Sequence, residues 1–220
     1  MAGKYGAATE AYSWHWANGT DEAHPGLAAK ITGTGAAFID RTWFAGGANY
    51  AEMFETVDGQ AIDCGYFVTF DGAEGKIRIC TDKDKYILGI TSAQPAVVGN
   101  SEELRWSYKY VTDEWGRVRY QTVTVPAVYD ARGRVLEPEH TELQPVLNPV
   151  WDAREPYNPR RLRPEWVTVG SLGQMLVRDN GSRRPGEFCK PGASGIAVPA
   201  KEGYRVMKRT GLNQILVLFR

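Results

Sequence analysis

The chain is organised around the stretch Gly46-Gly47-Ala48-Asn49-Tyr50-Ala51-Glu52-Met53-Phe54-Glu55. Two glycines and an alanine leave this backbone without bulky side chains, and glycine permits a strained or sharply turned conformation. An amide side chain follows at position 49 and a carboxylate at position 52, so polar groups stand ready to act on a nearby peptide bond as acid, base or nucleophile. An ordinary Gly-Gly turn leading into a strand is the commoner interpretation. The pattern alone leaves both open.

Composition and charge narrow the class of protein. At 220 residues the chain can bury a full core, as one large domain or two small ones. Its 26 basic and 26 acidic residues balance, so no general attraction to nucleic acid or to an anionic membrane is expected. No apolar run is long enough to span a membrane, and no signal peptide is expected. The 24 glycines and the many aromatic residues favour a mainly β fold.

No metal site and no cofactor are expected. Cys64, Cys80 and Cys189 are odd in number and lack CxxC spacing, so buried free thiols are expected rather than disulfides or a zinc site. The three histidines are too few and too scattered for a metal site. No GxSxG, Walker or GxGxxG pattern is present.

Short strands bounded by turn residues are expected along most of the chain, which argues for a small barrel or sandwich. The expected strands are 50–55, 66–70, 76–80, 85–90, 166–170, 174–178, 188–190, 196–198, 204–208 and 214–219. Residues 215–219 are apolar at every position, so the last strand is expected to be buried on both faces.

Residues 104–135 are expected to form inserted hairpins. The predicted pairs are 105–112 with 117–125 and 127–129 with 134–136. Because isolated hairpins are marginal in water, they should lean on the body or on a partner subunit.

A Pro-rich segment follows the hairpins. Six of the twelve prolines fall within 138–164, which predicts an extended segment that runs over a surface. Arg160, Arg161 and Arg163 lie in it and are interpreted as a solvated basic face rather than an anion site.

The first part of the chain is small and polar. Trp14 and Trp16 share a face if residues 13–19 are extended. An edge strand closed by an Asn-Gly turn is favoured there over a sugar-binding aromatic platform. Since this part is short of core residues, we expect it to bury itself against something else, such as neighbouring chains of a trimeric stem.

Separated motifs resemble one known family. The run 48–55 resembles the A-D-Y-A-E-M-F-E signature of the peptidase G2 family, the intramolecular-chaperone autoproteolytic domain at the C-terminus of bacteriophage appendage and tail-spike proteins. Further similar motifs lie at 65–69, 86–90, 140–149, 159–166 and 203–209. The resemblance runs from about residue 46 to the end, and residues 1 to about 40 carry none comparable. It implies an upstream β stem segment at 1–45 and an autoproteolytic chaperone domain at 46–220.

The resemblance also implies partners, a place and a reaction. The chain would form an intertwined homotrimer, continue an upstream fibre or appendage chain, and belong to a phage tail or appendage precursor made in the bacterial cytoplasm. The cleaved bond would be Ala48–Asn49, with Asn49 and Glu52 at the family's two acidic reactive positions. A carboxylate at position 49 can attack the carbonyl of residue 48 through a six-membered ring or orient a water there, and Glu52 would serve as general base or acid.

Position 49 departs from the family pattern, because Asn stands where the family has Asp. A neutral amide is a poor nucleophile and no base. Either this member cuts slowly or by another route, or the isosteric change traps the uncut form. The alternative function is a non-catalytic trimeric fibre-tip or adhesin module in which Trp14, Trp16 and Trp115 contact a surface glycan. A hydrolase that acts on other molecules ranks behind both.

Overall fold

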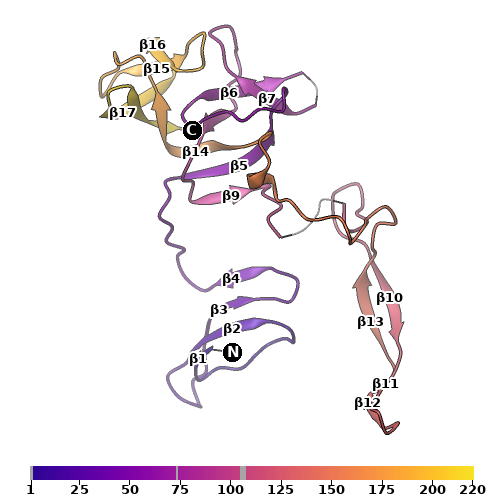
Figure 1. Cartoon of the computed structure of the whole chain (residues 1–220). Coiled ribbons are helices and arrows are strands. Elements are labelled where there is room, and N and C mark those ends of the chain that lie inside the picture. Colours follow the sequence, from indigo (N-terminus) through magenta and orange to yellow (C-terminus); the bar gives the residue numbers. More distant parts are fainter. Residues whose placement is uncertain (1, 73, 105–107) are drawn as a thin grey trace. The chain divides into compact units, whose positions relative to one another are not determined.

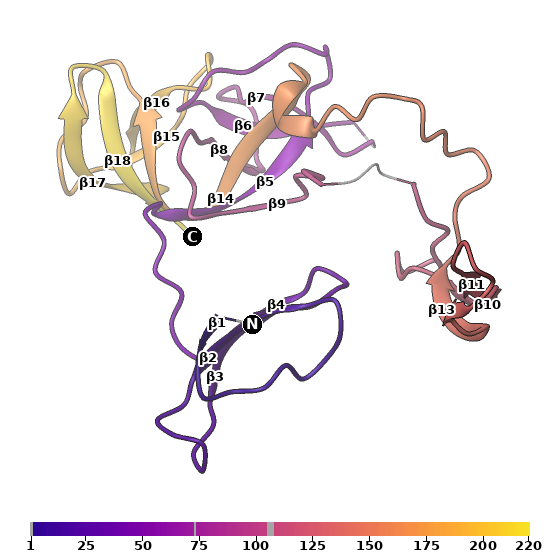
Figure 2. The same ribbon diagram turned by 60° about the horizontal axis from the view of Figure 1, so that its bottom comes forward.

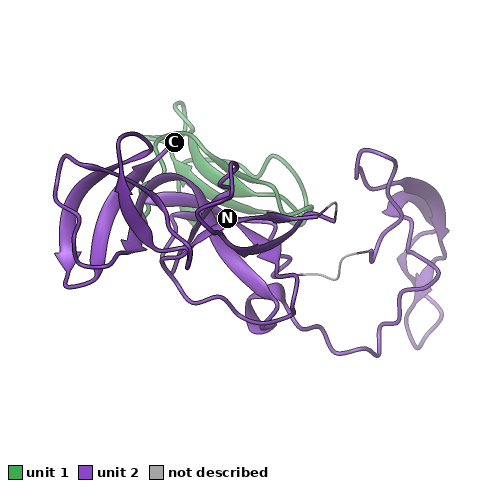
Figure 3. Ribbon diagram, turned by 90° about the horizontal axis from the view of Figure 1, so that it is seen from above, with its two compact units in different colours: residues 1–46 green, residues 47–220 purple. Residues whose placement is uncertain are grey.

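The computed structural model describes residues 2–72, 74–104 and 108–220, and its regular structure is almost entirely β (Figure 1). Two compact units divide the chain, residues 1–46 as unit 1 and residues 47–220 as unit 2 (Figure 3). The mainly β fold expected from composition is confirmed. Within the described ranges no helix has the length and apolar character needed to cross a membrane.

Unit 1 is a four-stranded sheet in the order β1-β2-β3-β4. Its strands are β1 (Ala2–Lys4), β2 (Trp14–Asn18), β3 (Leu27–Ile31) and β4 (Ala37–Ile39). On one face the ring of His15 is fully buried; its Nε2 accepts a hydrogen bond from the Thr9 backbone N–H at 3.2 Å, and its Nδ1 contacts Ser13 Oγ at 3.3 Å. Among residues 2–46, Ala17 is the only buried hydrophobic residue, so unit 1 has almost no core of its own.

Unit 2 is built on a ten-stranded sheet that curls into a half-barrel (Figure 2). Its strands are β5 (Asn49–Glu55), β6 (Phe67–Asp71), β7 (Lys76–Ile79), β8 (Gly89–Thr91), β9 (Val97–Gly99), β14 (Trp166–Arg178), β15 (Phe188–Pro191), β16 (Ala197–Ala200), β17 (Tyr204–Gly211) and β18 (Gln214–Phe219). The long strand β14 pairs antiparallel with β5, β8 and β18. It therefore joins the parts of the domain that flank the insertion.

Two strand predictions in unit 2 are wrong in extent. Residues 166–170 and 174–178 belong to one strand, because a bulge between Gly170 and Leu172 lets the ladder continue through Gly173. The strand expected at 85–90 is shorter and later, Gly89–Thr91, and the Tyr86 ring instead stacks on Phe70 at 5.9 Å between ring centroids.

The last strand, β18, is buried on one face only, so the prediction of two buried faces is wrong. Ile215 and Val217 are fully buried and Phe219 is 5% exposed, whereas Leu218 is 38% exposed and Leu216 is partly exposed. The strand lies inside the sheet between β14 and β17, but core packs against one side of it. A strand that is apolar at every position can therefore have only one buried face, and its composition does not show which face that is.

Two hydrophobic clusters fill unit 2. The larger includes Phe67 and the inward side chains of β14 and β18, and there the Tyr204 ring stacks 5.3 Å from Phe67 and 4.6 Å from Phe219. Burial raises the pKa of Tyr204 to about 12. The expected buried free thiols are present at Cys80 and Cys189, where burial raises the pKa of each to about 12, but Cys64 is exposed. The smaller cluster is formed by Val68, Ile77, Val167 and Val169.

A buried ion pair ties the end of β14 to β17. The Asp179 side chain is fully covered, and Arg209 Nη2 lies 2.6 Å from its Oδ2. Arg209 also donates to the carbonyls of Gly211 at 3.0 Å and Leu212 at 2.8 Å. Burial by itself raises the pKa of Asp179, but the guanidinium and the Arg183 backbone N–H outweigh it and leave that pKa below its ordinary value.

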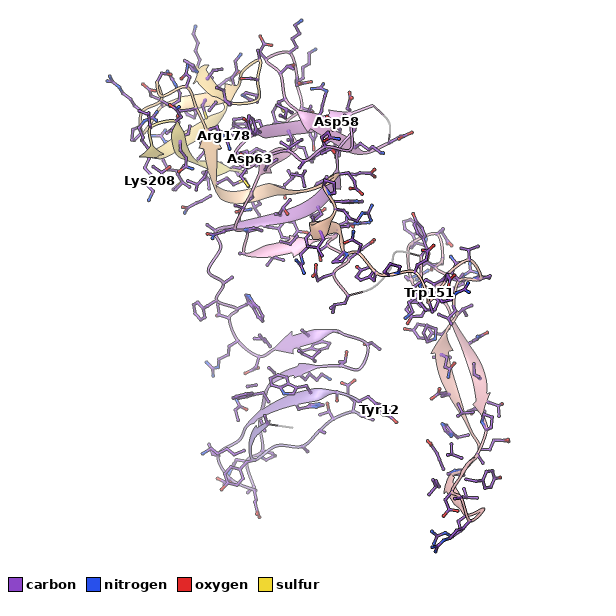
Figure 4. All side chains as sticks on the ribbon, in the orientation of Figure 1. Tyr12, Asp58, Asp63, Trp151, Arg178 and Lys208 are labelled. Atoms are coloured by element: carbon purple, nitrogen blue, oxygen red, sulfur yellow. The ribbon has the colours of Figure 1, made fainter. Side chains whose placement is uncertain are left out.

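We expect Arg209→Ala to destabilise unit 2 by about 3 kcal/mol, because a buried carboxylate then loses its partner. The depressed pKa of Asp179 means that the pair stabilises the fold at neutral pH, and that this contribution is lost as pH falls below about 4 and through the folded pKa. Urea unfolding at pH 7 and pH 3 measures both effects. Lys208→Ala, at an exposed neighbour on the same strand (labelled in Figure 4), is the control and should change little. Equal stability of Arg209→Ala and the unaltered chain at pH 7 would contradict the assignment.

Residues 120–145 form two successive two-stranded sheets, which together we call the ribbon. Its strands are β10 (Tyr120–Val125) with β13 (His140–Pro145), and β11 (Val128–Tyr129) with β12 (Val135–Glu137). The second predicted hairpin is confirmed. The first is confirmed only next to its turn, where Thr112 and Val118 form an antiparallel bridge and the Arg119 N–H donates to the Val111 carbonyl. From Tyr120 onward the predicted pairing is wrong, because β10 pairs with β13, and residues 105–107 lie outside the described ranges. The Pro-rich segment therefore includes a strand, since none of its prolines interrupts 139–144.

The arginine cluster closes the base of the insertion. Arg160 lies 2.7 Å from Glu102, and Arg161 lies 2.6 Å from Glu103. The Arg160 guanidinium also stacks 3.7 Å from the centroid of the Trp166 ring. Because the Arg160 side chain is only 11% exposed, its interpretation as part of a solvated basic face is wrong. Arg160 and Arg161 therefore join the two ends of the insertion, although Arg161 is 59% exposed, and Arg163 pairs with Glu165 of its own segment.

Candidate functional site

The peptide bond Ala48–Asn49 lies where the chain enters β5. The Ala48 carbonyl oxygen accepts a hydrogen bond from the Gln174 backbone N–H at 3.1 Å. The next carbonyl, that of Asn49, accepts one from the Ala96 backbone N–H at 2.7 Å. Strand β14 holds one carbonyl and the segment before β9 holds the other, so the bond is fixed on both sides.

Glycines make room for this bond. A Cβ on Gly47 would lie 2.3 Å from the Ala96 nitrogen, and a Cβ on Gly173 would lie 2.5 Å from the Ala48 oxygen. Gly173 also has a φ of 114°, which favours glycine. Gly46 has open space around it, and neither Gly46 nor Gly47 has a positive φ. The strained backbone that two glycines would permit is therefore not seen, and Gly47 permits close packing instead.

The Asn49 side chain is buried, with 6% of the residue exposed. Ser92 Oγ donates a hydrogen bond to its Oδ1 at 3.1 Å. Its Nδ2 has no hydrogen-bond partner in the described part of the chain and lies over Gly170, where a Cβ would stand 2.7 Å from it and equally close to the Met175 sulfur. The side chain at position 49 is thus anchored at one atom, while the other faces apolar groups. An unpaired buried polar atom carries a desolvation cost.

Glu52 faces the other way. Along β5, Asn49, Ala51 and Met53 point to the buried side, and Tyr50 and Glu52 point to the opposite side. Tyr50 Oη donates to Glu52 Oε1 at 2.6 Å, and this hydrogen bond raises the pKa of Tyr50. The structure therefore does not bring the side chains of Asn49 and Glu52 together within one chain, since three strand residues separate their Cα atoms by about 10 Å.

Glu52 shares its face with an open apolar surface. Leu172 stands opposite Tyr50, and the outward side chains of β14 and β18 continue the same surface. Its apolar members are Tyr50 (39% exposed), Leu172 (57%), Leu176 (47%), Leu218 (38%) and the partly exposed Leu216, and the exposed Gln174 lies among them opposite Leu218. We call these five residues the outer leucine face.

Ser92, Gly173 and Gln174 were missed by sequence reasoning. They come from segments 43 or more residues away from Asn49, and no local pattern marks them. The pairing of β5 with β14 places Gly173 and Gln174 at the bond, and the pairing of β8 with β14 brings Ser92 there.

Comparison with the sequence models of known families identifies the family of this chain. The sequence model of the family described as "Peptidase_G2, IMC autoproteolytic cleavage domain" matches residues 8–213. The chain belongs to the peptidase G2 family. The match starts at residue 8, so peptidase G2 similarity extends through unit 1, and the expectation that it begins near residue 46 is wrong.

Its peptidase G2 relatives include phage proteins. The pre-neck appendage protein of Bacillus phage B103 is 32% identical over 87% of this chain and 20% of its own length. The putative phage-related protein YobO of Bacillus subtilis is 33% identical over 73% of this chain and 19% of its own length. The chain therefore spans about a fifth of the length of these relatives.

Two solved structures share the fold. The pre-mature bacteriophage phi29 gene product 12 is 26% identical, with a TM-score of 0.73 over 88% of this chain and 24% of that one. The C-terminal fragment of the same phi29 protein is 28% identical, with a TM-score of 0.61 over 78% of this chain and all of the fragment.

Proposed function

We propose that this chain is the self-cleaving chaperone end of a phage appendage protein, and that it assembles as a homotrimer and cuts the bond between Ala48 and Asn49. The observation that carries the proposal is the way in which the structure holds the Ala48–Asn49 bond. Its carbonyl oxygen receives the Gln174 N–H, a glycine at 173 leaves the space, and the side chain of residue 49 is buried beside Ser92. Family membership supplies the class of reaction, autoproteolytic cleavage.

The reaction is a hydrolysis of one peptide bond. Water adds to the carbonyl carbon of Ala48 after giving a proton to a carboxylate base, and the developing oxyanion is stabilised by the Gln174 N–H. The C–N bond then breaks, and the nitrogen of residue 49 leaves as an amine after it takes up a proton. An aspartic acid at position 49 stands next to that nitrogen, and burial favours its protonated form, so it suits the role of general acid. The Asn49 amide cannot donate a proton in this way, which makes this chain slow or inactive.

The base is Glu52, supplied by a neighbouring copy. Within one chain Glu52 lies on the face opposite to the Asn49 side chain, together with the outer leucine face. Exposed leucines on a sheet next to the site favour burial against another copy. A neighbouring copy that packs on the outer leucine face brings its own Ala48–Asn49 bond toward Glu52 of this chain. Cleavage therefore occurs only in the complete assembly. The exposed ribbon side chains, such as Leu136 and Leu143 at 68%, favour a further contact with partner chains.

Assembly followed by cleavage is the order of events expected of a chaperone domain that is cut from the appendage protein once that protein has assembled. Residues 49–220 make up 78% of the chain, the share that aligns with the whole phi29 C-terminal fragment, and this agreement supports a cut after Ala48. The phage appendage relatives support a place in a virion appendage. Synthesis in the bacterial cytoplasm and an upstream appendage chain as the covalent partner belong to the same proposal.

A mixing experiment tests the proposal. One chain carries Asn49→Asp and Glu52→Gln with a mass tag, and the other is the unaltered chain, which has Glu52 but lacks the acid. We expect neither to cut alone and the tagged chain to be cut after the two are unfolded together and refolded as mixed assemblies. Asn49→Asp alone, cutting in every copy, is the positive control. If it cuts but the mixture does not, Glu52 acts within its own chain and the trans arrangement is wrong. If assembled Asn49→Asp does not cut, the proposed activity is wrong.

A further inference from the structure

Strand β9 lies along the edge of β5 that β14 leaves open, and it has no other partner strand among the described residues. β5 therefore lies between β14 and β9 (Figure 1). The Ala96 N–H donates to the Asn49 carbonyl at 2.7 Å, and Asn100 Nδ2 donates to the Met53 carbonyl at 3.0 Å. The segment between these two contacts thus follows β5 from the bond proposed for cleavage to the residue after Glu52.

Strand β9 also contacts the proposed base. Register places Gly99 opposite Glu52. A Cβ on Gly99 would lie 2.8 Å from Tyr50 Oη and 3.1 Å from Glu52 Cγ, so the backbone at Gly99 lies directly against this hydrogen-bonded pair. A shift of β9 would therefore move the Glu52 carboxylate, and a general base acts only when it lies within reach of the proton that it takes.

Hydrophobic burial contributes little to holding β9 in place. Val97 is 49% exposed and Val98 is 38% exposed, and neither belongs to the two hydrophobic clusters of unit 2. Just after the strand, Asn100 and Glu102 have φ values of 54° and 46°, a left-handed conformation that is unfavourable for residues with a Cβ. Other contacts must therefore fix the end of β9 in its observed conformation.

Arg160 supplies such contacts. Its Nη1 donates to the Asn100 backbone carbonyl at 2.8 Å and to the Asn100 side-chain oxygen, and its Nη2 donates to Glu102 Oε1 at 2.7 Å. The guanidinium lies over the ring of Trp166, the first residue of β14, at 3.7 Å from the ring centroid. Arg160 therefore connects β14 to the end of β9, across the strand β5 that carries Glu52.

We infer that Arg160 is a positioning residue for self-cleavage, which holds β9 against β5 and thereby fixes the carboxylate of Glu52. The inference rests on the proposed function and assigns to the base of the insertion a part in that reaction. A guanidinium suits this role because its planar fork of N–H donors can bind a carbonyl and a carboxylate at once while it stacks on a ring, whereas a lysine ammonium lacks that geometry. Arg161 joins the same two segments through Glu103, and its side chain is 59% exposed.

Cleavage in mixed assemblies tests the inference. One chain carries Asn49→Asp and Glu52→Gln and supplies the bond, and the other supplies Glu52. Arg160→Ala in the chain that supplies Glu52 should slow cutting by roughly 10- to 100-fold, as a misplaced base would, and should have a much smaller effect in the chain that supplies the bond. A merely structural role would slow both alike. Arg160→Lys should give an intermediate rate.

Arg161→Ala is the matched control, because it removes a neighbouring arginine whose exposed ion pair joins the same segments. It should leave the rate unchanged. If it slows cutting as much as Arg160→Ala does, a general loosening of the insertion explains the effect and the inference is wrong.

Hydrogen exchange read by mass spectrometry gives a measurement that needs no cleavage. Arg160→Ala should speed amide exchange several-fold in residues 96–102 and leave the amides of β18 protected. Unchanged exchange at 96–102 would overturn the inference, and so would an equal loss of protection in β18, which would make Arg160 a residue of general stability.

The failure of the proposed function is recognised separately. If Asn49→Asp cuts but mixed assemblies do not, the base acts within its own chain, and the same loss of rate is then expected in a chain that carries both Asn49→Asp and Arg160→Ala. An unchanged rate in that chain would overturn the positioning role while the self-cleavage stands. If assembled Asn49→Asp does not cut at all, the proposed function fails and the positioning role fails with it.

Discussion

Asn49→Asp is expected to make the chain cut itself into fragments of about 5 and about 19 kDa, by scaling the 24.4 kDa mass to 48 and 172 residues. The change replaces a partnerless amide nitrogen with a carboxyl oxygen beside the departing nitrogen, while Ser92 still donates to the other oxygen. Gel electrophoresis and mass spectrometry give the fragment masses and the new first residue at position 49.

Single substitutions identify the two groups, the acid proposed at position 49 and the base proposed at Glu52. Adding Glu52→Gln should abolish cutting, and Ser92→Ala should slow it because the carboxyl loses its anchor. Asn180→Asp makes the same chemical change at an exposed site and is the control. A correctly assembled Asn49→Asp chain that stays intact after long incubation would refute the assignment.

Val217→Asp is expected to unfold unit 2. Val217 is fully buried in the larger cluster, and an unpaired charge there costs about 5 kcal/mol or more, which is comparable to the whole stability of a domain. Circular dichroism should show loss of the β spectrum, and the protein should become insoluble or sensitive to protease.

Leu218→Asp is the matched control, since it makes a similar change one residue further on the opposite face of β18. Leu218 is 38% exposed in the single chain, so at concentrations too low for assembly the fold should change by no more than about 1 kcal/mol and the spectrum should persist. Because Leu218 belongs to the outer leucine face, the same change should weaken the proposed assembly. The contrast tests whether β18 has one covered face. Equal loss of structure in the two variants would mean that both faces are buried.

The sequence was sufficient for the family and for most strand positions, and the site at Ala48–Asn49 stays a prediction. The motif 48–55 pointed to the peptidase G2 family, whose sequence model matches residues 8–213. The turn residues and alternating patterns located β6, β7, β15 and β17 close to their observed bounds, and the second hairpin around 130–133 was correct. These features are local, because turns and alternation depend on residues near one another in the chain.

The pairing of segments that lie far apart in the chain could not be predicted from the sequence. The partner of β10 is β13, some twenty residues away, although a nearer segment was predicted. The bulge in β14 carries the ladder through Gly173, a residue that local rules treat as the end of a strand. Arg160 and Arg161 were assigned to solvent because their partners Glu102 and Glu103 lie about sixty residues earlier.

By itself, the sequence determined that this is a β protein of the peptidase G2 family with a reactive-looking bond at Ala48–Asn49 and an amide where the family has an acid. Only the tertiary structure decided how that bond is held and that Asn49 and Glu52 lie on opposite faces of β5. The chemical groups near the bond are known from the local sequence. The side of a strand that meets the core depends instead on which distant strands pair with it and on where bulges reverse the alternation.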